Sequence, residues 1–222
     1  MTGCSGLFGL WLLDLLRCAN EELNLDIQAG VLTRHAGTFY SRYPHLQHMD
    51  GLTAIEGDIR SFVLGKFQPT HLIHGATTSA HETFNGESPL RKFDTLVDGT
   101  RHLFSLMPYG SIRAGLFLSS GAYYGKVTEG AVCIAESHAI APLPQDLDSA
   151  LGHAKRAAEF LCHANADELN IPLRVARCFS FSGAGLPLDL HYAVGDFVQQ
   201  ALNSQTVEVK GDGTAVRSYL HL

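Results

Sequence analysis

Three glycines at the start of the chain have the spacing that a phosphate-binding turn requires. Gly3, Gly6 and Gly9 form a G-x-x-G-x-x-G pattern, and apolar residues with helical spacing follow over 7–23. Glycine permits a tight turn and close approach of a ligand, and the end of a helix offers N–H groups and a positive dipole end. The pattern therefore predicts a pyrophosphate site, although three glycines in an ordinary loop are an equally simple interpretation.

The residues after the next predicted strand bear on which nucleotide would fit. A strand is predicted over 25–32, and Thr33-Arg34-His35 follows it. A site that selects NAD usually has an acidic residue here, beside the adenosine ribose, whereas an arginine suits the 2′-phosphate of NADP. Arg34 therefore favours NADP slightly over NAD, unless it is simply a solvated surface residue.

These residues need a sheet and helices to hold them, and the chain alternates between the two. The further predicted strands lie at 52–56, 71–76, 114–118 and 172–178, and the further helices at 89–106 and 149–169. Strands that alternate with helices of this length indicate βαβ units. We therefore expect an α/β fold with a Rossmann-type, doubly wound parallel sheet.

The character of the chain changes after Phe181. Glycine and proline become frequent, a helix is predicted over 191–202, and a short strand is predicted over 206–210. We therefore predict a Rossmann-like dinucleotide-binding domain at 1–180 and the beginning of a smaller substrate-binding region at 181–222.

The composition argues against several classes of protein. The net charge of -6 over 222 residues does not suit a nucleic-acid binder. The five cysteines are scattered without a CxxC pair, so we expect neither a disulfide framework nor a zinc module, and a reducing cytoplasm fits best. The apolar run at 6–16 is interrupted by Asp14, lacks a basic segment before it, and is shorter than the ~18 residues of a membrane span.

Seven separated stretches, in matching order and spacing, resemble the extended short-chain dehydrogenase/reductases of the NAD-dependent epimerase/dehydratase family. They are TGCSGLFG at 2–9, GDIR at 57–60, HLIHGAT at 71–77, LFLSSGAYYG at 116–125, ALGHAKRAAE at 150–159, ARCFSFSGAG at 176–185 and VKGDGTAVRSYLHL at 209–222. The resemblance covers essentially the whole chain, and nucleotide-sugar dehydratases and epimerases are the nearest in kind.

The resemblance implies a nicotinamide dinucleotide, NAD or NADP, held by the glycine turn and the ends of the following strands. The Asp of the GDIR stretch commonly meets the adenine in this family. The implied cofactor contacts are Gly3, Gly6, Leu7, Phe8, Gly9, Arg34, Asp58, Ile59, Ala76 and Lys155.

The resemblance also implies a catalytic set that this chain holds only in part. Family members oxidise a sugar hydroxyl with the help of a Ser or Thr, a Tyr base and a Lys that lies four residues after the Tyr. Ser120 and Lys155 match the serine and the lysine, but Leu151 occupies the tyrosine position. His153 lies about 200° around the helix from Leu151 at 3.6 residues per turn, so it should not replace the phenol. A strand-end capping serine and a solvated helix lysine are the structural alternatives.

Two further features complete the set of candidate residues. Arg217 resembles the family arginine that meets the substrate's diphosphate, and a surface arginine is the alternative. The pairs His45/His48 and His71/His74 have an HxxH spacing, but the first falls in a predicted loop and the second would point to opposite faces of a strand. We therefore expect no metal site.

The family pattern extends beyond both ends of the chain. The first family strand should precede Thr2, and further sequence should follow Leu222, so we expect an internal piece of a longer protein. The sheet neighbours of that strand would then present unpaired edges.

Two classes of function follow. The first is an NAD(P)-dependent nucleotide-sugar epimerase or dehydratase that Leu151 impairs, and the second is a catalytically silent dinucleotide-binding module; a non-functional gene fragment is a third interpretation. The expected partner is a nucleotide sugar, not a nucleic acid or a membrane. Family members often pair through two helices, here 89–106 and 149–169, so a homodimer is one expectation for an oligomeric state that stays open.

Overall fold

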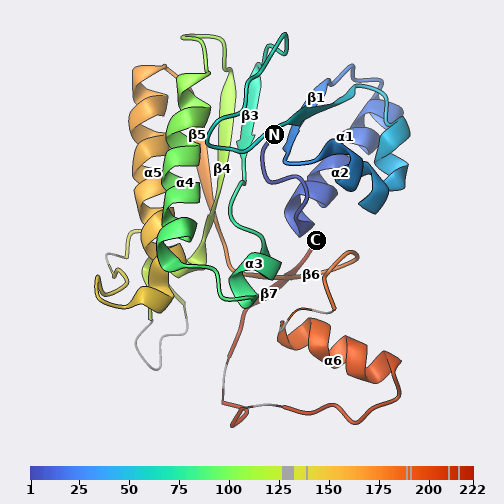
Figure 1. Ribbon diagram of the computed structural model, residues 1–222, viewed down its shortest axis with the longest axis vertical. Coiled ribbons are helices and arrows are strands. Elements are labelled where there is room, and N and C mark those ends of the chain that lie inside the picture. Colours follow the sequence, from blue (N-terminus) through green and yellow to red (C-terminus); the bar gives the residue numbers. More distant parts are fainter. Residues whose placement is uncertain (127–132, 139, 189, 191, 210, 215) are drawn as a thin grey trace. The chain divides into compact units, whose positions relative to one another are not determined.

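The computed structural model describes residues 1–126, 133–138, 140–188, 190, 192–209, 211–214 and 216–222 (Figure 1). Its helices are α1 (Leu7–Leu23), α2 (Ala36–Arg42), α3 (Ala80–Phe84), α4 (Pro89–Ser105), α5 (Ala150–Glu168) and α6 (Ala193–Leu202). Its strands are β1 (Ala29–Thr33), β2 (Leu52–Glu56), β3 (His71–His74), β4 (Ala114–Ser120), β5 (Leu173–Cys178), β6 (Ser180–Ser182) and β7 (Tyr219–His221). Among the residues described, no helix is long and apolar enough to cross a membrane.

The predicted helices and the strands of the first 178 residues are confirmed, and two of the strands are clearly shorter than predicted. The strand predicted over 71–76 ends at His74. The strand predicted over 25–32 begins only at Ala29. The reason lies in Asn20, whose side chain donates to the Ile27 carbonyl at 3.0 Å and accepts from the Ile27 N–H at 2.9 Å. Both backbone groups of Ile27 are therefore satisfied by a side chain instead of a neighbouring strand.

The strand predicted over 206–210 is wrong in its described part. Residues 206–209 form no strand, and residue 210 lies outside the described residues. The Glu208 N–H donates to the side-chain oxygen of Gln200 at 2.7 Å, so a side chain of α6 takes the hydrogen bond that a strand partner would need.

The strands pair in parallel throughout. β1 pairs with β2, and β3, β4 and β5 form a three-stranded sheet in that order. Met1 and Thr2 lie between β1 and β3: the Met1 carbonyl accepts from the Leu32 N–H at 2.9 Å, and the Thr2 N–H donates to the Ile73 carbonyl at 2.9 Å. This two-residue segment joins the two sheets into the parallel arrangement of a Rossmann-like fold.

Apolar side chains fill both faces around these strands. Val31 and Leu32 are adjacent in β1 and point to opposite faces, and each is buried in a different core. The Leu32 core holds side chains of α4 and α5, which lie side by side along β3, β4 and β5 (Figure 1). The Val31 core holds Leu13 of α1 and Phe39 of α2. The sheet is therefore covered by helices on both faces, as the prediction of a doubly wound fold requires.

The chain divides into two compact units. The first comprises 1–78 and 88–178, and the second comprises 79–87 and 179–222. Every predicted site residue except Arg217 belongs to the first unit. The second unit holds α3, α6 and the parallel pair β6–β7. The domain boundary predicted after residue 180 stays a prediction.

Candidate functional site

Two of the three turn glycines are required by the fold itself. Gly3 has φ +79°, which side chains rarely adopt, and a Cβ there would collide with the backbone of Gly75 at the end of β3. A Cβ at Gly9 would collide with the backbone of Cys4. Gly3 and Gly9 therefore let the turn lie directly against β3 and against the start of its own helix.

Gly6 differs from the other two because open space lies beside it. A Cβ at Gly6 would meet only the Gly3 carbonyl oxygen, at an ordinary 3.5 Å. Gly6 is the N-cap of α1 with φ -92° and ψ 171°, no side chain caps this helix end, and its first turn holds no acidic residue. The N-terminus of a 17-residue helix thus stands at a glycine with room beside it, which is the arrangement that binds phosphate groups.

The end of β3 is hydrogen-bonded to this turn. The Thr2 hydroxyl oxygen accepts from the N–H of Gly75 at 3.2 Å and from the N–H of Ala76 at 3.1 Å. The structure therefore brings Ala76, a predicted cofactor contact, beside the glycine turn.

The residues after β1 and β2 are engaged with one another. Both oxygens of Asp58 accept from the Arg60 guanidinium, at 2.8 and 3.0 Å, and these hydrogen bonds lower the pKa of Asp58 to about 2. Exposed Arg34 contributes a weaker electrostatic effect on the same carboxylate. Ile59 is buried in the core, where its side chain contacts Gly99 of α4. Asp58 and Arg34 thus interact electrostatically, and a nucleotide site shared by the two stays a prediction.

Ser120 lies at the end of β4, where it starts a short 3-10 turn. Its hydroxyl oxygen accepts from the Ala122 N–H at 3.1 Å and caps the turn Gly121–Tyr124. Within the sheet Ser120 is paired with Cys178 of β5. The capping role expected as an alternative is present, and the hydroxyl proton remains available because the oxygen acts here as an acceptor.

Lys155 is buried and points from α5 to the sheet. Its ammonium donates to the Leu118 carbonyl at 2.6 Å and lies 4.8 Å from the centre of the Phe117 ring. Burial lowers the pKa of Lys155 to about 8, an effect that Cys178, Cys162 and Glu159 partly oppose. The alternative of a solvated helix lysine is therefore wrong.

Leu151 lies one turn before Lys155 on α5, which begins at Ala150. Residues four apart share a face of a helix, so Leu151 lies on the same face as Lys155. That Leu151 occupies the tyrosine position of the family stays a prediction. The register is fixed by Gly152, where a Cβ would collide with the Ala122 carbonyl oxygen and lie 2.7 Å from Pro142. His153 is held elsewhere, with its Nε2 3.0 Å from the Leu143 carbonyl.

An ion pair between buried Glu159 and half-buried Arg177 was not predicted from the sequence. Arg177 of β5 donates to both oxygens of Glu159 and to the Tyr124 hydroxyl, and the Ser119 hydroxyl donates to Glu159 as well. The bonds to Glu159 and Tyr124 raise the pKa of Arg177. This network ties α5, β4, β5 and the turn after β4 together, and no spacing in the sequence indicates the pairing of Glu159 with Arg177.

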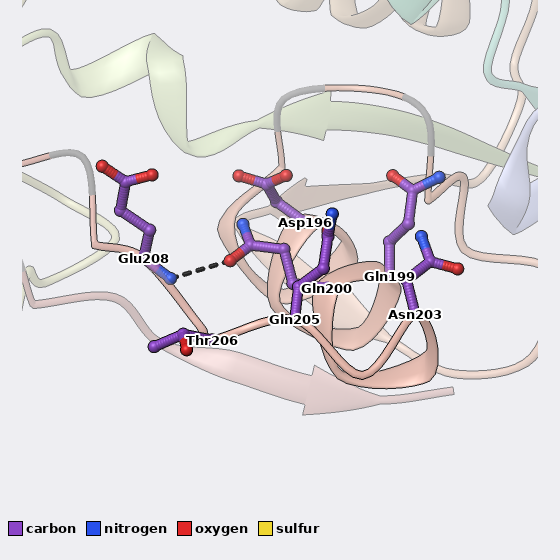
Figure 2. Close-up of a pocket in the computed structure, with 7 residues that line it drawn as sticks. All are labelled: Asp196, Gln199, Gln200, Asn203, Gln205, Thr206 and Glu208. Carbon is purple, nitrogen blue, oxygen red and sulfur yellow. Dashed lines mark hydrogen bonds between the residues drawn. The ribbon is translucent and has the colours of Figure 1, made fainter.

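The remaining candidate belongs to the second unit. Arg217 is exposed in the second unit, where its guanidinium donates to the Val216 carbonyl at 3.0 Å. A hollow in that unit is lined by polar side chains of α6 and the segment after it (Figure 2): Asp196, Gln199, Gln200, Asn203, Gln205, Thr206 and Glu208. None of them was predicted as a site residue. The described parts of the chain contain no group of three metal-ligating side chains.

The comparison with protein families shows which family this chain belongs to. The model of the NAD dependent epimerase/dehydratase family matches residues 1–222. The chain belongs to this family. UDP-glucuronic acid decarboxylase 4 of Arabidopsis thaliana is 25% identical over 219 residues, which is 99% of this chain and 47% of that protein. The chain thus spans about half the length of this relative.

Solved structures of other family members share the fold. A dTDP-glucose 4,6-dehydratase from Bacillus anthracis, in complex with NAD, is 20% identical with a TM-score of 0.77, over 99% of this chain and 66% of that one. A UDP-glucuronic acid 4-epimerase from Bacillus cereus, in complex with UDP-glucuronic acid and NAD, is 20% identical with a TM-score of 0.75, over 99% and 68%. The Rossmann-like architecture is therefore shared with nucleotide-sugar dehydratases and epimerases.

Proposed function

We propose that this member of the family holds a nicotinamide dinucleotide on its glycine turn, with the pyrophosphate beside Gly6. The observation that supports this proposal is the difference among the three glycines. Backbone atoms lie too close to Gly3 and Gly9 for a side chain, whereas Gly6 has space beside it at a helix end that no side chain caps. Relatives with the same fold are recorded in complex with NAD. Leu7, Phe8, Asp58, Ile59 and Ala76 complete the proposed cofactor contacts.

The proposed reaction type is oxidoreduction of a nucleotide sugar, impaired at one step. When bound, the dinucleotide supplies the hydride acceptor. Ser120 can donate its hydroxyl proton to the sugar oxygen, and Lys155 provides a cationic group from the neighbouring helix. Leu151 cannot accept the proton that leaves the sugar hydroxyl, and general bases typically contribute 10²- to 10⁴-fold in rate.

A catalytically silent dinucleotide-binding module is the second candidate, and Leu151 is the observation that favours it. The binding features of the glycine turn do not depend on residue 151. Binding without turnover would then be the function, as a sensor or a scaffold for a partner.

We propose that NADP binds no more weakly than NAD. Arg34 is exposed at the end of β1, where the family places the adenosine ribose, and this position holds no acid. Arg60 is paired with Asp58. We propose Arg34 as the cation for a 2′-phosphate because of its position directly after β1.

Calorimetric titration of NAD and NADP into the wild-type chain and two variants tests the binding proposal. Gly6→Val places a branched side chain in the open space without backbone strain, because φ at this position is -92°. Gly37→Val on α2 is the matched control, since nothing lies within 4 Å of a Cβ there. We expect binding by the wild type and the control and its loss in Gly6→Val. Equal binding by all three proteins would contradict a pyrophosphate site beside Gly6. A preference for NAD over NADP of tenfold or more would contradict the proposed contact of Arg34 with a 2′-phosphate.

The nucleotide-sugar partner and the homodimer are part of the same proposal. The epimerase of similar fold is recorded with UDP-glucuronic acid, and the exposed Arg217 guanidinium is the proposed contact for a substrate diphosphate. Leu90 of α4 and Phe160 of α5 are 74% and 71% exposed on the helices through which family members pair. Light scattering should show weaker self-association for Phe160→Glu than for the wild type.

A further inference from the structure

Three buried side chains form a hydrogen-bonded chain from the glycine turn to α4. The Thr2 hydroxyl lies 2.8 Å from His74 Nδ1, and the Thr100 hydroxyl lies 3.0 Å from His74 Nε2. Thr2, His74 and Thr100 are 6%, 2% and 0% exposed. The Phe117 ring packs against the His74 ring at 5.2 Å between centres. The three side chains therefore depend on one another for their hydrogen bonds.

Thr100, on α4, determines which nitrogen of His74 carries the hydrogen. Thr100 Oγ1 lies 2.7 Å from the Leu96 carbonyl oxygen, which can only accept, so the hydroxyl donates its single hydrogen there. Toward His74 the same oxygen must accept. Nε2 of His74 is therefore the protonated nitrogen.

The turn end gives the same answer independently. Thr2 Oγ1 accepts from the N–H groups of Gly75 and Ala76, which uses both of its lone pairs. Its own hydrogen must then go to His74 Nδ1, which has to be bare. The opposite tautomer would bring a third donor to this oxygen and leave the hydroxyl hydrogen unused. The doubly protonated form is disfavoured because burial lowers the pKa of His74 to about 3.

We propose that Thr100 is a positioning residue for the glycine turn: it fixes His74 as the Nε2–H tautomer and so keeps Thr2 Oγ1 an acceptor for the Gly75 and Ala76 N–H groups. The hydroxyl of α4 thereby holds the turn against the end of β3. The consequence for dinucleotide affinity rests on the proposed function, whereas the tautomer rests on the described contacts alone.

Removal of the Thr100 hydroxyl would weaken the preference of His74 for the Nε2–H tautomer. In Thr100→Val the Nε2–H group loses its acceptor, and the tautomer with hydrogen on Nδ1 is no longer disfavoured at that end. A donor at Nδ1 would compete with the Gly75 and Ala76 N–H groups for Thr2 Oγ1. The turn then loses part of its attachment to β3, and we expect dinucleotide affinity to fall about tenfold, the size of one hydrogen bond.

Nitrogen NMR of the full chain with ¹⁵N-labelled histidine reads the tautomer directly, and His74→Gln assigns the signals. We expect a protonated Nε2 and a bare Nδ1 near pH 7 in the wild type and in Thr100→Ser, and a weaker preference in Thr100→Val, in which only the Thr2 end still favours this tautomer. Thr95→Val is the matched control, because Thr95 donates to the Arg91 carbonyl four residues earlier on the same helix but does not touch His74. Calorimetry should show the tenfold loss with NAD or NADP only in Thr100→Val.

Each result decides the inference. A wild-type His74 with hydrogen on Nδ1, or on both nitrogens, overturns it, as does a Thr100→Val protein with unchanged tautomer and affinity. If the wild type binds no dinucleotide, the proposed function fails while the NMR result still decides the tautomer. If Thr100→Val does not fold, Thr100→Cys keeps a side chain of similar size with a weaker acceptor, and an unchanged His74 signal in it counts against the inference.

Discussion

At the scale of single residues, position 151 is where we propose that this chain differs from a catalytically active family member. Leu151 and Lys155 stand one turn apart on α5, and the contact of Gly152 with Ala122 fixes their register. The chain therefore has Ser120 and Lys155 in the order of the family pattern, but Leu151 instead of a tyrosine. The backbone needs no change to accept a tyrosine there, because the helix already runs through the position.

We expect no measurable hydride transfer by the wild type and a gain of at least about a hundredfold for Leu151→Tyr. A phenol can accept the sugar proton if nearby cations lower its pKa from about 10, and buried Lys155 is the cation in register. The measurement is nicotinamide absorbance with a panel of nucleotide sugars. Leu151→Phe is the control, since it supplies the ring without the hydroxyl. An active wild type, or a folded and cofactor-binding Leu151→Tyr that gains nothing, would contradict the placement of the catalytic helix.

His74 makes stability depend on pH with a definite sign. Its pKa is about 3 in the folded chain and about 6.5 when unfolded, so below pH 6.5 the unfolded state binds a proton that the folded state does not. The contribution of His74 to stability is therefore present above about pH 6.5 and is lost as pH falls toward 3. We expect it to be about 2 kcal/mol smaller at pH 5 than at pH 7. Urea unfolding of the wild type and His74→Gln at both pH values measures this; equal pH dependence in the two proteins would show that His74 titrates normally.

At the scale of elements, the Glu159–Arg177 pair holds the proposed catalytic segments together. Glu159 is 5% exposed and accepts from β5 through Arg177 and from β4 through Ser119. Arg177 also stacks on the Tyr123 ring at 3.6 Å. The pair thus connects α5 with both strands whose ends carry site residues.

Loss of one member of this pair should destabilise the whole unit. Glu159→Ala leaves a half-buried guanidinium without its carboxylate and is expected to cost about 1.5 to 3 kcal/mol, the contribution of hydrogen bonds to a charged group. Ser119→Ala removes one hydrogen bond and should cost about 1 kcal/mol. Chemical denaturation of each variant gives both values. A loss below about 1 kcal/mol for Glu159→Ala would mean that water replaces the carboxylate with little penalty.

The elements were largely predictable, and the contacts between them were not. Periodic apolar spacing gave α1, α4 and α5, and the glycine pattern gave the turn. The start of β1 was predicted too early because the Asn20 side chain forms hydrogen bonds with the N–H and the carbonyl of Ile27. The spacing of apolar residues gives no sign of such a contact. The pairing of Glu159 with Arg177 depends on α5 and β5 lying together, so it becomes visible only in three dimensions.

At the scale of the molecule, two residues join the sheets. Met1 and Thr2 hydrogen-bond to β1 and β3, and these two strands are not otherwise paired with each other in the described residues. Backbone groups along the rest of these edges are a template for further strand pairing.

We expect the 222-residue chain to self-associate beyond a dimer in solution. Open parallel edges at β1 and β3 favour association that rises with concentration. Light scattering over a concentration series, combined with thermal melting, measures it. Phe160→Glu is the control, because it should remove a dimer built on α5 and leave edge association in place. A monodisperse species with one cooperative melt would contradict this expectation.

The close approach at Gly152 has an evolutionary consequence. Because the backbone of α5 rests on the turn after β4 with no room for a side chain at 152, residue 151 cannot shift to another position along the helix. A lineage can therefore exchange tyrosine and leucine at 151 without altering the scaffold around it. Gain and loss of catalysis would then be reversible events at a single site, while mutation at 152 would damage the enzyme and the silent binder alike.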